Sequence, residues 1–221
     1  MSEAPTGCRL YAVVEAGESA SERLAAALAT ADLAVVLIAP ARAQMLVAAE
    51  ARPLIDQARS AGVTALVLGD ASLARAVGAD GVHLGTQDDP QAAYAAARKV
   101  LGAAGVIGAE AGISRHAAML LAEAGADYVG FGAPADLNDR PKARLRRADM
   151  IAWWAPIFEV PSVALDVETP EEAEDLAVAG ADFIAVTLPA ALTAEAARDL
   201  VADVARAIGQ TIHASTGKPS S

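Results

Sequence analysis

The sequence predicts a single (β/α)8 barrel, and three observations favour this fold class. Apolar runs rich in Val, Ile and Leu alternate with alanine-rich helical segments along the whole chain. Near-continuous apolar strands are typical of a parallel sheet that is buried on both faces. A ten-residue pattern also returns at every second expected strand, and 221 residues suffice for one barrel domain.

Eight strands are expected, and each precedes a segment with helical spacing. Helix start signals support this order, for example Ser19 ahead of Glu22 and the run Thr169-Pro170-Glu171. The barrel domain is expected to span 8–211, with flexible termini at 1–7 and 212–221. The expected strands lie at 9–15, 33–39, 64–69, 81–85, 106–110, 128–132, 162–166 and 183–188.

The repeated pattern consists of AVGADGVHLG at 76–85, EAGADYVGFG at 123–132 and VAGADFIAVT at 178–187. In each copy a helix is expected to end at the glycine, which tolerates a left-handed backbone, and a strand to begin soon afterwards. The spacing of the copies corresponds to about two strand–helix units. Equivalent turns at every second unit favour a closed barrel over the alternative, an open doubly wound sheet.

Composition and charge restrict the classes of partner. Lys and Arg number 17 and Asp and Glu number 28, so the net charge is −11. This charge argues against nucleic acid and anionic membranes as partners, because both require a basic surface. No apolar run reaches the roughly 18 residues of a membrane helix, and the single cysteine, Cys8, cannot pair within the chain. We therefore expect a cytoplasmic protein that binds a small molecule.

The candidate site lies where the strands end, because barrel enzymes build their active sites at the C-terminal strand ends. Asp70 and Asp88 follow neighbouring strands and could share a divalent cation, for which Mg²⁺ is the expected ion. The alternative is that both are helix N-caps, since Asp88 or Asp89 precedes Pro90 and Asp70 precedes a helical run. Further polar residues and glycines at these ends are Gly69, His83, Thr86, Glu110 and Asp166.

Two histidines and one glutamate are candidates for proton transfer or ligand contact. Strand alternation places His83 inside the barrel near its mouth, where a buried core histidine is the alternative. His116 opens a helix and could reach the mouth, although an exposed first-turn residue is the simpler interpretation. His116 and Glu110 are the weak catalytic candidates of this sequence.

The stretch 134–147 is expected to be the one long polar connection in the chain, and it follows the sixth strand. Long connections in compact domains often act as lids over an active site. The alternative is a solvated approach to the next helix. The positive charge is densest here, in Arg140, Lys142, Arg144, Arg146 and Arg147.

The segment LGDASLARAVGADGVHLGTQDDP at 68–90 resembles the signature of thiamine-phosphate synthases, and GADYVGFG at 125–132 is similar to a second motif of that family. The resemblance covers roughly residues 10–210. It implies a Mg²⁺-assisted coupling of a pyrimidine diphosphate to a thiazole phosphate, with Asp70 and Asp88 as the metal carboxylates. It also implies a phosphorylated ligand and a possible homo-oligomer.

The chain departs from that family at the positions that hold phosphate. Only Arg42 remains near the end of the second strand, where the family has a Gln-x-Arg-x-Lys grip on its substrate. Asp166 and Val167 occupy the turn where the family has Gly-Gly. Other positions differ from the family as well. This chain has Gly69 where the family has Asn, Thr86 where it has Gln, Ala133 where it has Pro, Leu137 and Asp139 where it has threonines, Arg140 near the position of a lysine, and Leu188 followed by Pro189 where it has a serine.

Each lost charged contact with phosphate removes about 1.5–3 kcal/mol, and a carboxylate in a phosphate cup adds repulsion. We therefore expect residues Arg42, Gly69, His83, Thr86, Arg140 and Asp166 to line a ligand site with impaired or altered coupling activity. Three functions stay open: an active synthase, a relative with another acid–base activity such as that of the thiazole tautomerases, and a non-catalytic binding barrel.

Overall fold

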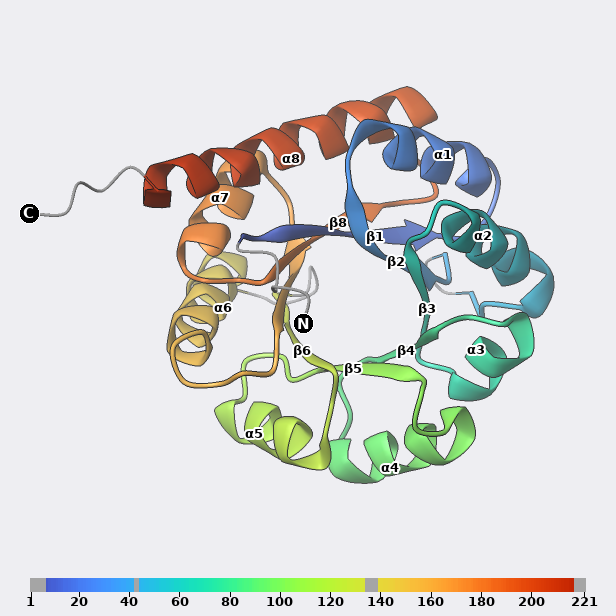
Figure 1. Cartoon of the computed structure of the whole chain (residues 1–221), viewed down its shortest axis with the longest axis horizontal. Coiled ribbons are helices and arrows are strands. Elements are labelled where there is room, and N and C mark those ends of the chain that lie inside the picture. The colour runs from blue at the N-terminus through green and yellow to red at the C-terminus, as the bar shows by residue number, and fades with distance from the viewer. Residues whose placement is uncertain (1–6, 42–43, 134–138, 217–221) are drawn as a thin grey trace, which may run out of the picture.

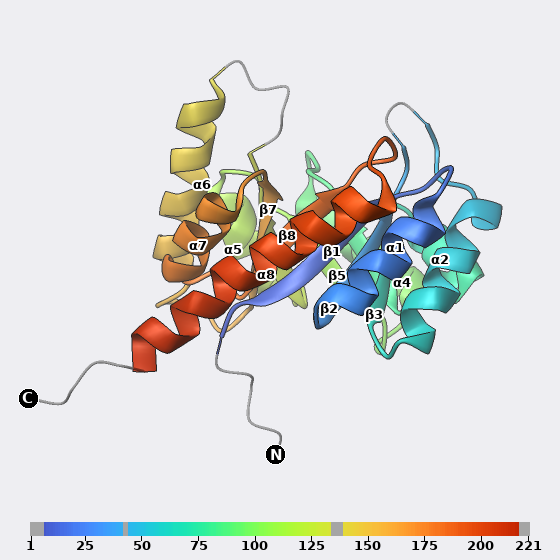
Figure 2. The same ribbon diagram turned by 90° about the horizontal axis from the view of Figure 1, so that it is seen from above.

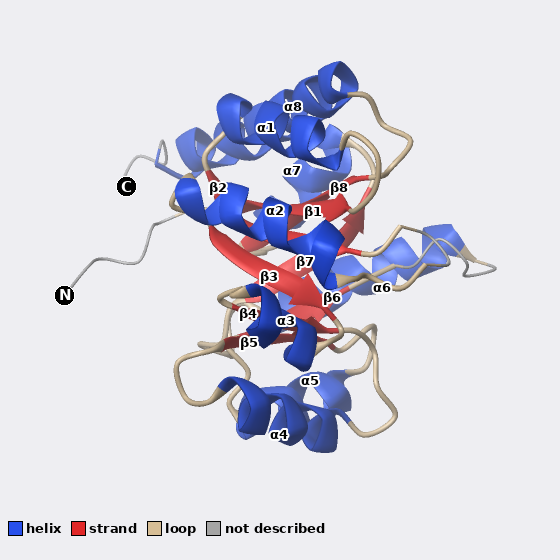
Figure 3. Ribbon diagram, turned by 90° about the vertical axis from the view of Figure 1, so that its right-hand side faces the viewer, coloured by secondary structure: helices blue, strands red, loops and turns tan. Residues whose placement is uncertain are grey.

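The computed structural model describes residues 7–41, 44–133 and 139–216, with side chains described as far as residue 209. These residues form a closed barrel of eight parallel strands in sequence order, surrounded by eight helices (Figure 1). The strands lie inside and the helices outside (Figure 3). The predicted fold class is therefore confirmed, and the open doubly wound alternative is excluded.

Strands and helices alternate without exception along the described chain. The first, second, fifth and eighth strands have the expected bounds. The third, fourth, sixth and seventh differ from the expected bounds by one residue at their C-terminal ends. The strands are β1 (Arg9–Glu15), β2 (Leu33–Ala39), β3 (Thr64–Leu68), β4 (Gly81–Leu84), β5 (Val106–Glu110), β6 (Tyr128–Phe131), β7 (Ser162–Val167) and β8 (Phe183–Leu188). The helices are α1 (Ala20–Thr30), α2 (Ala48–Ser60), α3 (Ala71–Val77), α4 (Pro90–Leu101), α5 (Arg115–Ala124), α6 (Arg140–Trp154), α7 (Pro170–Val178) and α8 (Ala194–Thr216).

Two apolar clusters form because successive strand residues face opposite sides of the barrel wall. The larger cluster lies between the strands and the helices and includes the fully buried Leu24, Ile55 and Trp154. Burying side chains of this size stabilises the fold by roughly 1.5–3 kcal/mol each. The smaller cluster fills the barrel interior with Tyr11, Leu37, Leu66, Tyr128, Val163, Leu165 and Ala185.

The aspartate of the repeated pattern closes the N-terminal rim of the barrel at three equivalent places. Asp80, Asp127 and Asp182 each accept a hydrogen bond from a backbone N–H at the start of the preceding odd-numbered strand. The donors are the N–H groups of Ala65 at 2.8 Å, Ile107 at 2.7 Å and Ser162 at 2.7 Å. The repeat therefore joins β4, β6 and β8 each to the strand before it.

Two expectations about helix starts are wrong. Ser19 precedes α1 but has φ 56° and makes no side-chain cap, so the expected capping box does not form. The stretch 134–147 is not a connection throughout, because α6 begins at Arg140. Asp139 caps that helix by accepting the N–H of Lys142 at 3.2 Å, and Pro141 lies in its first turn. The dense positive charge obscured this start signal in the sequence.

The last helix, α8, runs along one side of the barrel from Ala194 to Thr216 (Figure 2). It continues past residue 211, the expected end of the domain, and the domain bounds stay a prediction. Within the described residues, no helix combines the length and the apolar character required to cross a membrane.

Candidate functional site at the barrel mouth

A chain of three polar side chains crosses the apolar interior of the barrel. The Tyr11 and Tyr128 hydroxyls are 2.9 Å apart, and the Tyr128 hydroxyl is 2.9 Å from Nδ1 of His83. The His83 and Tyr128 rings are stacked with centroids 5.6 Å apart. Burial lowers the pKa of His83 to about 4, so the imidazole is neutral at pH 7. His83 therefore points into the barrel, as strand alternation predicts.

Two carboxylates converge at the mouth. Glu110 ends β5 and Asp166 lies near the end of β7, on either side of β6. A Cβ atom added at Gly132 would lie 2.6 Å from Oε1 of Glu110 and 2.8 Å from Oδ2 of Asp166. The two oxygens are thus separated by no more than the sum of these distances. A side chain at position 132 would therefore displace one or both carboxylates from these positions.

The carboxyl group of Glu110 has a strongly altered acidity. The pKa of Glu110 is raised from 4.5 to about 7, mainly by burial and also by the negative charge of Asp166, while a hydrogen bond from the Thr86 side chain opposes the rise. A group that titrates near neutral pH in a cleft is a candidate for proton transfer or for charge-dependent binding. This finding favours Glu110 over His116 among the predicted catalytic residues.

Asp166 occupies the turn where the resemblance predicts two glycines. Its φ of 56° is in the left-handed region, which asparagine and aspartate tolerate better than most residues. Its Oδ2 accepts the Ala133 N–H at 2.9 Å, so the carboxylate already binds a backbone donor at the end of β6. A phosphate at this turn would have to compete with that carboxylate for the amide.

Asp70 and Asp88 lie on the loops after β3 and β4, and their role as metal ligands stays a prediction. Oδ1 of Asp70 caps α3 by accepting the N–H groups of Ser72 at 2.8 Å and Leu73 at 2.9 Å. Asp89, rather than Asp88, caps α4 by accepting the Ala92 N–H at 2.9 Å. No cluster of three or more potential metal ligands occurs in the part of the chain that the structure describes. The N-cap interpretation is therefore correct for Asp70, while Asp88 stays exposed.

The other predicted residues lie around the rim. Gly69 donates its N–H to the carbonyl of His83 at 2.8 Å and so ties the end of β3 to β4. Thr86 is exposed beside Glu110. His116 is exposed in the first turn of α5, and its side chain makes no hydrogen bond to the described residues, as its simpler interpretation predicted. Arg42 lies outside the described residues.

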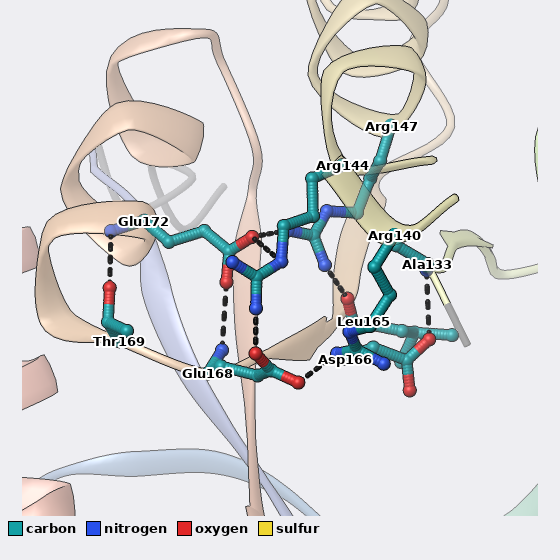
Figure 4. A network of polar contacts seen from close by, with 9 residues as sticks. All are labelled: Ala133, Arg140, Arg144, Arg147, Leu165, Asp166, Glu168, Thr169 and Glu172. Atoms are coloured by element: carbon teal, nitrogen blue, oxygen red, sulfur yellow. Dashed lines mark hydrogen bonds and ion pairs between the residues drawn. The ribbon is translucent and has the colours of Figure 1, made fainter. Parts of the chain in front are cut away.

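Three arginines of α6 pair with carboxylates at the start of α7 and in the turn before it (Figure 4). Arg140 pairs with Glu168, and Arg144 pairs with both Glu168 and Glu172. Arg147 is fully buried, pairs with Glu172 and donates to the carbonyl of Leu165. These three arginines therefore bind the chain's own carboxylates and brace α6 against the start of α7.

The sequence reasoning did not assign Tyr11, Tyr128 and Arg147 to the site or its support. The alternation that placed His83 inside the barrel applies equally to both tyrosines, and two inward-facing hydroxyls predict a shared hydrogen-bond partner. No comparable signal exists for Arg147, because its burial depends on how α6 packs against β7 and α7.

Comparison with known proteins supports the resemblance. Residues 10–189 match the family model described as thiamine monophosphate synthase. A thiamine-phosphate synthase from Rhodospirillum centenum is 39% identical over 189 residues, which cover 82% of this chain and 88% of that protein. A thiamine-phosphate synthase from Erythrobacter litoralis is 44% identical over 126 residues, which cover 56% of this chain and 58% of that protein.

A solved structure with a similar fold is thiamine phosphate pyrophosphorylase from Pyrococcus furiosus, with a TM-score of 0.72 and 22% identity. The similarity covers 92% of this chain and 96% of that chain, and at this identity it shows the fold alone. The family match, by contrast, extends over most of the sequence and reaches all eight strands of the barrel. This chain therefore belongs to the thiamine monophosphate synthase family.

Proposed function

We propose that the protein acts in thiamine biosynthesis as a thiamine-phosphate-synthase-like barrel whose coupling of pyrimidine diphosphate to thiazole phosphate is impaired or altered. The observation that carries the proposal is the contact between Asp166 and the Ala133 N–H at 2.9 Å. A carboxylate occupies the amide donor that an anionic ligand at the β7 turn would require. Repulsion between this carboxylate and a phosphate weakens binding in a partly shielded site.

Among the described residues, the arginines of α6 do not compensate for this charge. Arg140 and Arg144 pair with Glu168, and Arg147 is buried beneath the rim. Freeing any of them for a phosphate would leave a carboxylate of the chain without its partner. The local balance thus favours a neutral or positively charged ligand group near Glu110 and Asp166, which supports altered activity over the family reaction.

Mg²⁺ belongs to this proposal only together with a diphosphate ligand. Mg²⁺ is commonly held by one or two carboxylates, while phosphate oxygens and waters complete its octahedron. Asp70 retains Oδ2 after capping α3, and Asp88 is exposed on the next loop, so these two residues would hold the ion. Bound there, Mg²⁺ would neutralise the charge of a leaving diphosphate.

A cytoplasmic location and self-association complete the proposal. Cys8 is free, as expected for a protein of a reducing compartment. Homo-oligomer formation rests on the family resemblance alone. The ligand class is a small molecule, and neither nucleic acid nor a membrane is proposed as a partner, because the net charge is −11.

The test is a coupling assay that compares this protein with the Rhodospirillum centenum relative under identical conditions, with Mg²⁺ and both phosphorylated substrates. Two lost phosphate contacts of about 1.5–3 kcal/mol each predict a kcat/KM lower by roughly 100-fold or more. Asp166→Gly removes the competing carboxylate and should strengthen binding of inorganic phosphate, measured by calorimetry. A coupling rate within about tenfold of the relative's rate would contradict the proposal.

A further inference from the structure

Asp166 lies in a β-bulge near the end of β7. From Ala164 to Val167 the pairing advances three residues along β7, whereas on β8 it advances two, from 184 to 186. One extra residue of this kind bends a strand, and bulges beside active sites often redirect a side chain. Asp166 also has φ 56°, a conformation that a residue with a side chain keeps only where its surroundings hold it. The position of the Asp166 carboxylate therefore depends on the contacts around the bulge.

Two side chains bind the backbone on either side of Asp166 (Figure 4). Arg147 of α6 donates from Nη1 to the carbonyl oxygen of Leu165, the residue before Asp166. Glu172 of α7 accepts the N–H of Glu168, two residues after Asp166, at 2.8 Å. Arg147 and Glu172 also pair with each other through Nη2. The Arg147–Glu172 pair therefore holds the backbone on both sides of the bulge.

This pair is shielded from water, unlike the pairs that Glu168 makes. The side chains of Arg147 and Glu172 are 0% and 14% exposed. Glu168, which pairs with Arg140 and Arg144, is 46% exposed. Exposed ion pairs contribute little to holding a structure, whereas a buried charge that loses its partner is strongly disfavoured. Burial lowers the pKa of the Arg147 guanidinium, and the charge of Glu172 opposes the decrease. The Arg147–Glu172 pair is thus the contact best suited to fix the bulge.

We propose that Arg147 and Glu172 are positioning residues that hold the bulge so that the Asp166 carboxylate stays on the Ala133 N–H. The carboxylate accepts this N–H at 2.9 Å, and both positioning residues bind the backbone beside Asp166, so they act through it. The consequence for ligands rests on the proposed function, in which the carboxylate opposes a phosphate at the mouth. Without the pair, the bulge relaxes, the carboxylate turns away, and the N–H is open to an oxyanion.

Hydrogen exchange of backbone amides, followed by NMR on the full wild-type chain, tests whether the bulge opens as one unit. The N–H groups of Ala133 and Glu168 follow different strands but depend on the same pair. We expect one opening to release both, so that their protection factors agree within about tenfold. A larger difference would overturn the proposal. This comparison needs no variant and decides even if a substitution prevents folding.

Arg147→Lys breaks the double contact and keeps the charge. An ammonium lacks the planar fork with which a guanidinium binds two acceptors at once. We expect this variant to accelerate exchange of the Ala133 N–H at least about tenfold more than that of the Ile107 N–H, which Asp127 binds at the opposite rim. Equal acceleration of both amides is what a general loss of stability produces, and it would overturn the proposal.

Arg144→Lys is the matched control on the same helix. Arg144 pairs with Glu168 and Glu172, and its ion pairs in the described structure are with these carboxylates rather than with the backbone of the bulge. The same substitution here should leave exchange of the Ala133 N–H within about twofold of wild type. If both lysine variants accelerate this exchange equally, the assignment to Arg147 is wrong.

Release of the Ala133 N–H should also appear as a gain in anion binding. In calorimetric titrations with inorganic phosphate, we expect Arg147→Lys to bind at least about fivefold more tightly than wild type or Arg144→Lys. A loss of structure would not produce such a gain. Asp166→Gly removes the carboxylate directly and should bind phosphate at least as tightly as Arg147→Lys.

These variants separate the inference from the proposed function. Tighter phosphate binding in Asp166→Gly but not in Arg147→Lys would overturn the inference and keep the proposed function. Unchanged binding in both variants, together with faster exchange of the Ala133 N–H in Arg147→Lys, would contradict the proposed function and keep the positioning role.

Discussion

The two ends of the barrel use carboxylates in different ways. At the N-terminal rim, Asp80, Asp127 and Asp182 repeat one contact, each with a backbone N–H of the preceding strand at 2.7–2.8 Å. At the mouth, Glu110 and Asp166 come from different elements and converge on each other. Repetition at one end closes the barrel, while the irregular arrangement lies at the end where barrel enzymes build their active sites.

The largest expected effect tests the N-terminal rim. In Gly81→Ala the new Cβ would lie 1.9 Å from the carbonyl oxygen of Val106, which belongs to the backbone of the adjacent strand. That backbone cannot move without breaking the pairing of β4 with β5, so we expect a loss of about 3 kcal/mol or more in the free energy of unfolding. Urea unfolding followed by circular dichroism measures this loss.

Gly132→Ala is the matched control at the mouth. There the new Cβ meets the ends of two side chains, Glu110 and Asp166, which can rotate away. Its free energy of unfolding should change by less than ~1 kcal/mol. Similar losses in both alanine variants would show that the two ends do not differ as described.

A smaller effect is expected from the rim aspartates. Asp127→Ala removes the acceptor of the Ile107 N–H and the ion pair with Arg98 at 3.2 Å. The loss of a hydrogen bond to a charged group predicts a decrease of about 1.5–3 kcal/mol in the free energy of unfolding. Asp89→Ala, which removes the cap of α4 at the mouth, should cost about 1 kcal/mol. Urea unfolding measures both losses. If Asp127→Ala lowers the free energy of unfolding by no more than Asp89→Ala does, the rim aspartates do not have the structural role described.

The fold could be predicted from the sequence because local and global signals agree. The strands carry continuous apolar runs, and the Gly-Ala-Asp repeat marks the same turn at every second strand. The hydrogen bond that the aspartate of that repeat accepts was not predictable, because its donor is a backbone N–H on a different strand. Arg140, Arg144 and Arg147 pair with glutamates that follow the next strand, so the run of cations alone did not predict these ion pairs.

The candidate site was predictable in its members but not in its contacts. Strand ends and alternation identified Glu110, Asp166 and His83 from the sequence alone. That Glu110 faces Asp166 depends on the left-handed backbone of Asp166, which regular alternation does not predict. For Asp70, by contrast, the contact itself was predictable. The helical run that follows it predicts that its side chain caps the helix, as observed, whether or not a metal is bound.

A further expected effect concerns the pH dependence of stability. The pKa of Glu110 is raised from 4.5 to about 7 in the folded protein, mainly by burial. Below pH 4.5 the Glu110 carboxyl is protonated in the folded and in the unfolded protein, so it does not lower the free energy of unfolding. Between pH 4.5 and about 7 the unfolded chain loses this proton first, so the free energy of unfolding decreases as pH rises. The buried His83 has the opposite sign, because its pKa is lowered from 6.5 to about 4 and stability falls as pH decreases through that window.

These two contributions partly cancel in the wild-type protein between pH 4.5 and 6.5, and Glu110→Gln separates them. Without the glutamate, only the His83 contribution of the pair remains, so the stability of the variant relative to wild type should increase from pH 4.5 to about 7 and then level off. Urea unfolding at a series of pH values measures the difference, with Glu123→Gln as the control for net charge. If the difference in the free energy of unfolding does not change with pH, Glu110 ionises in the folded protein as it does in water. The contrast between the structural carboxylates of the N-terminal rim and a protonated carboxyl group at the mouth would then be wrong.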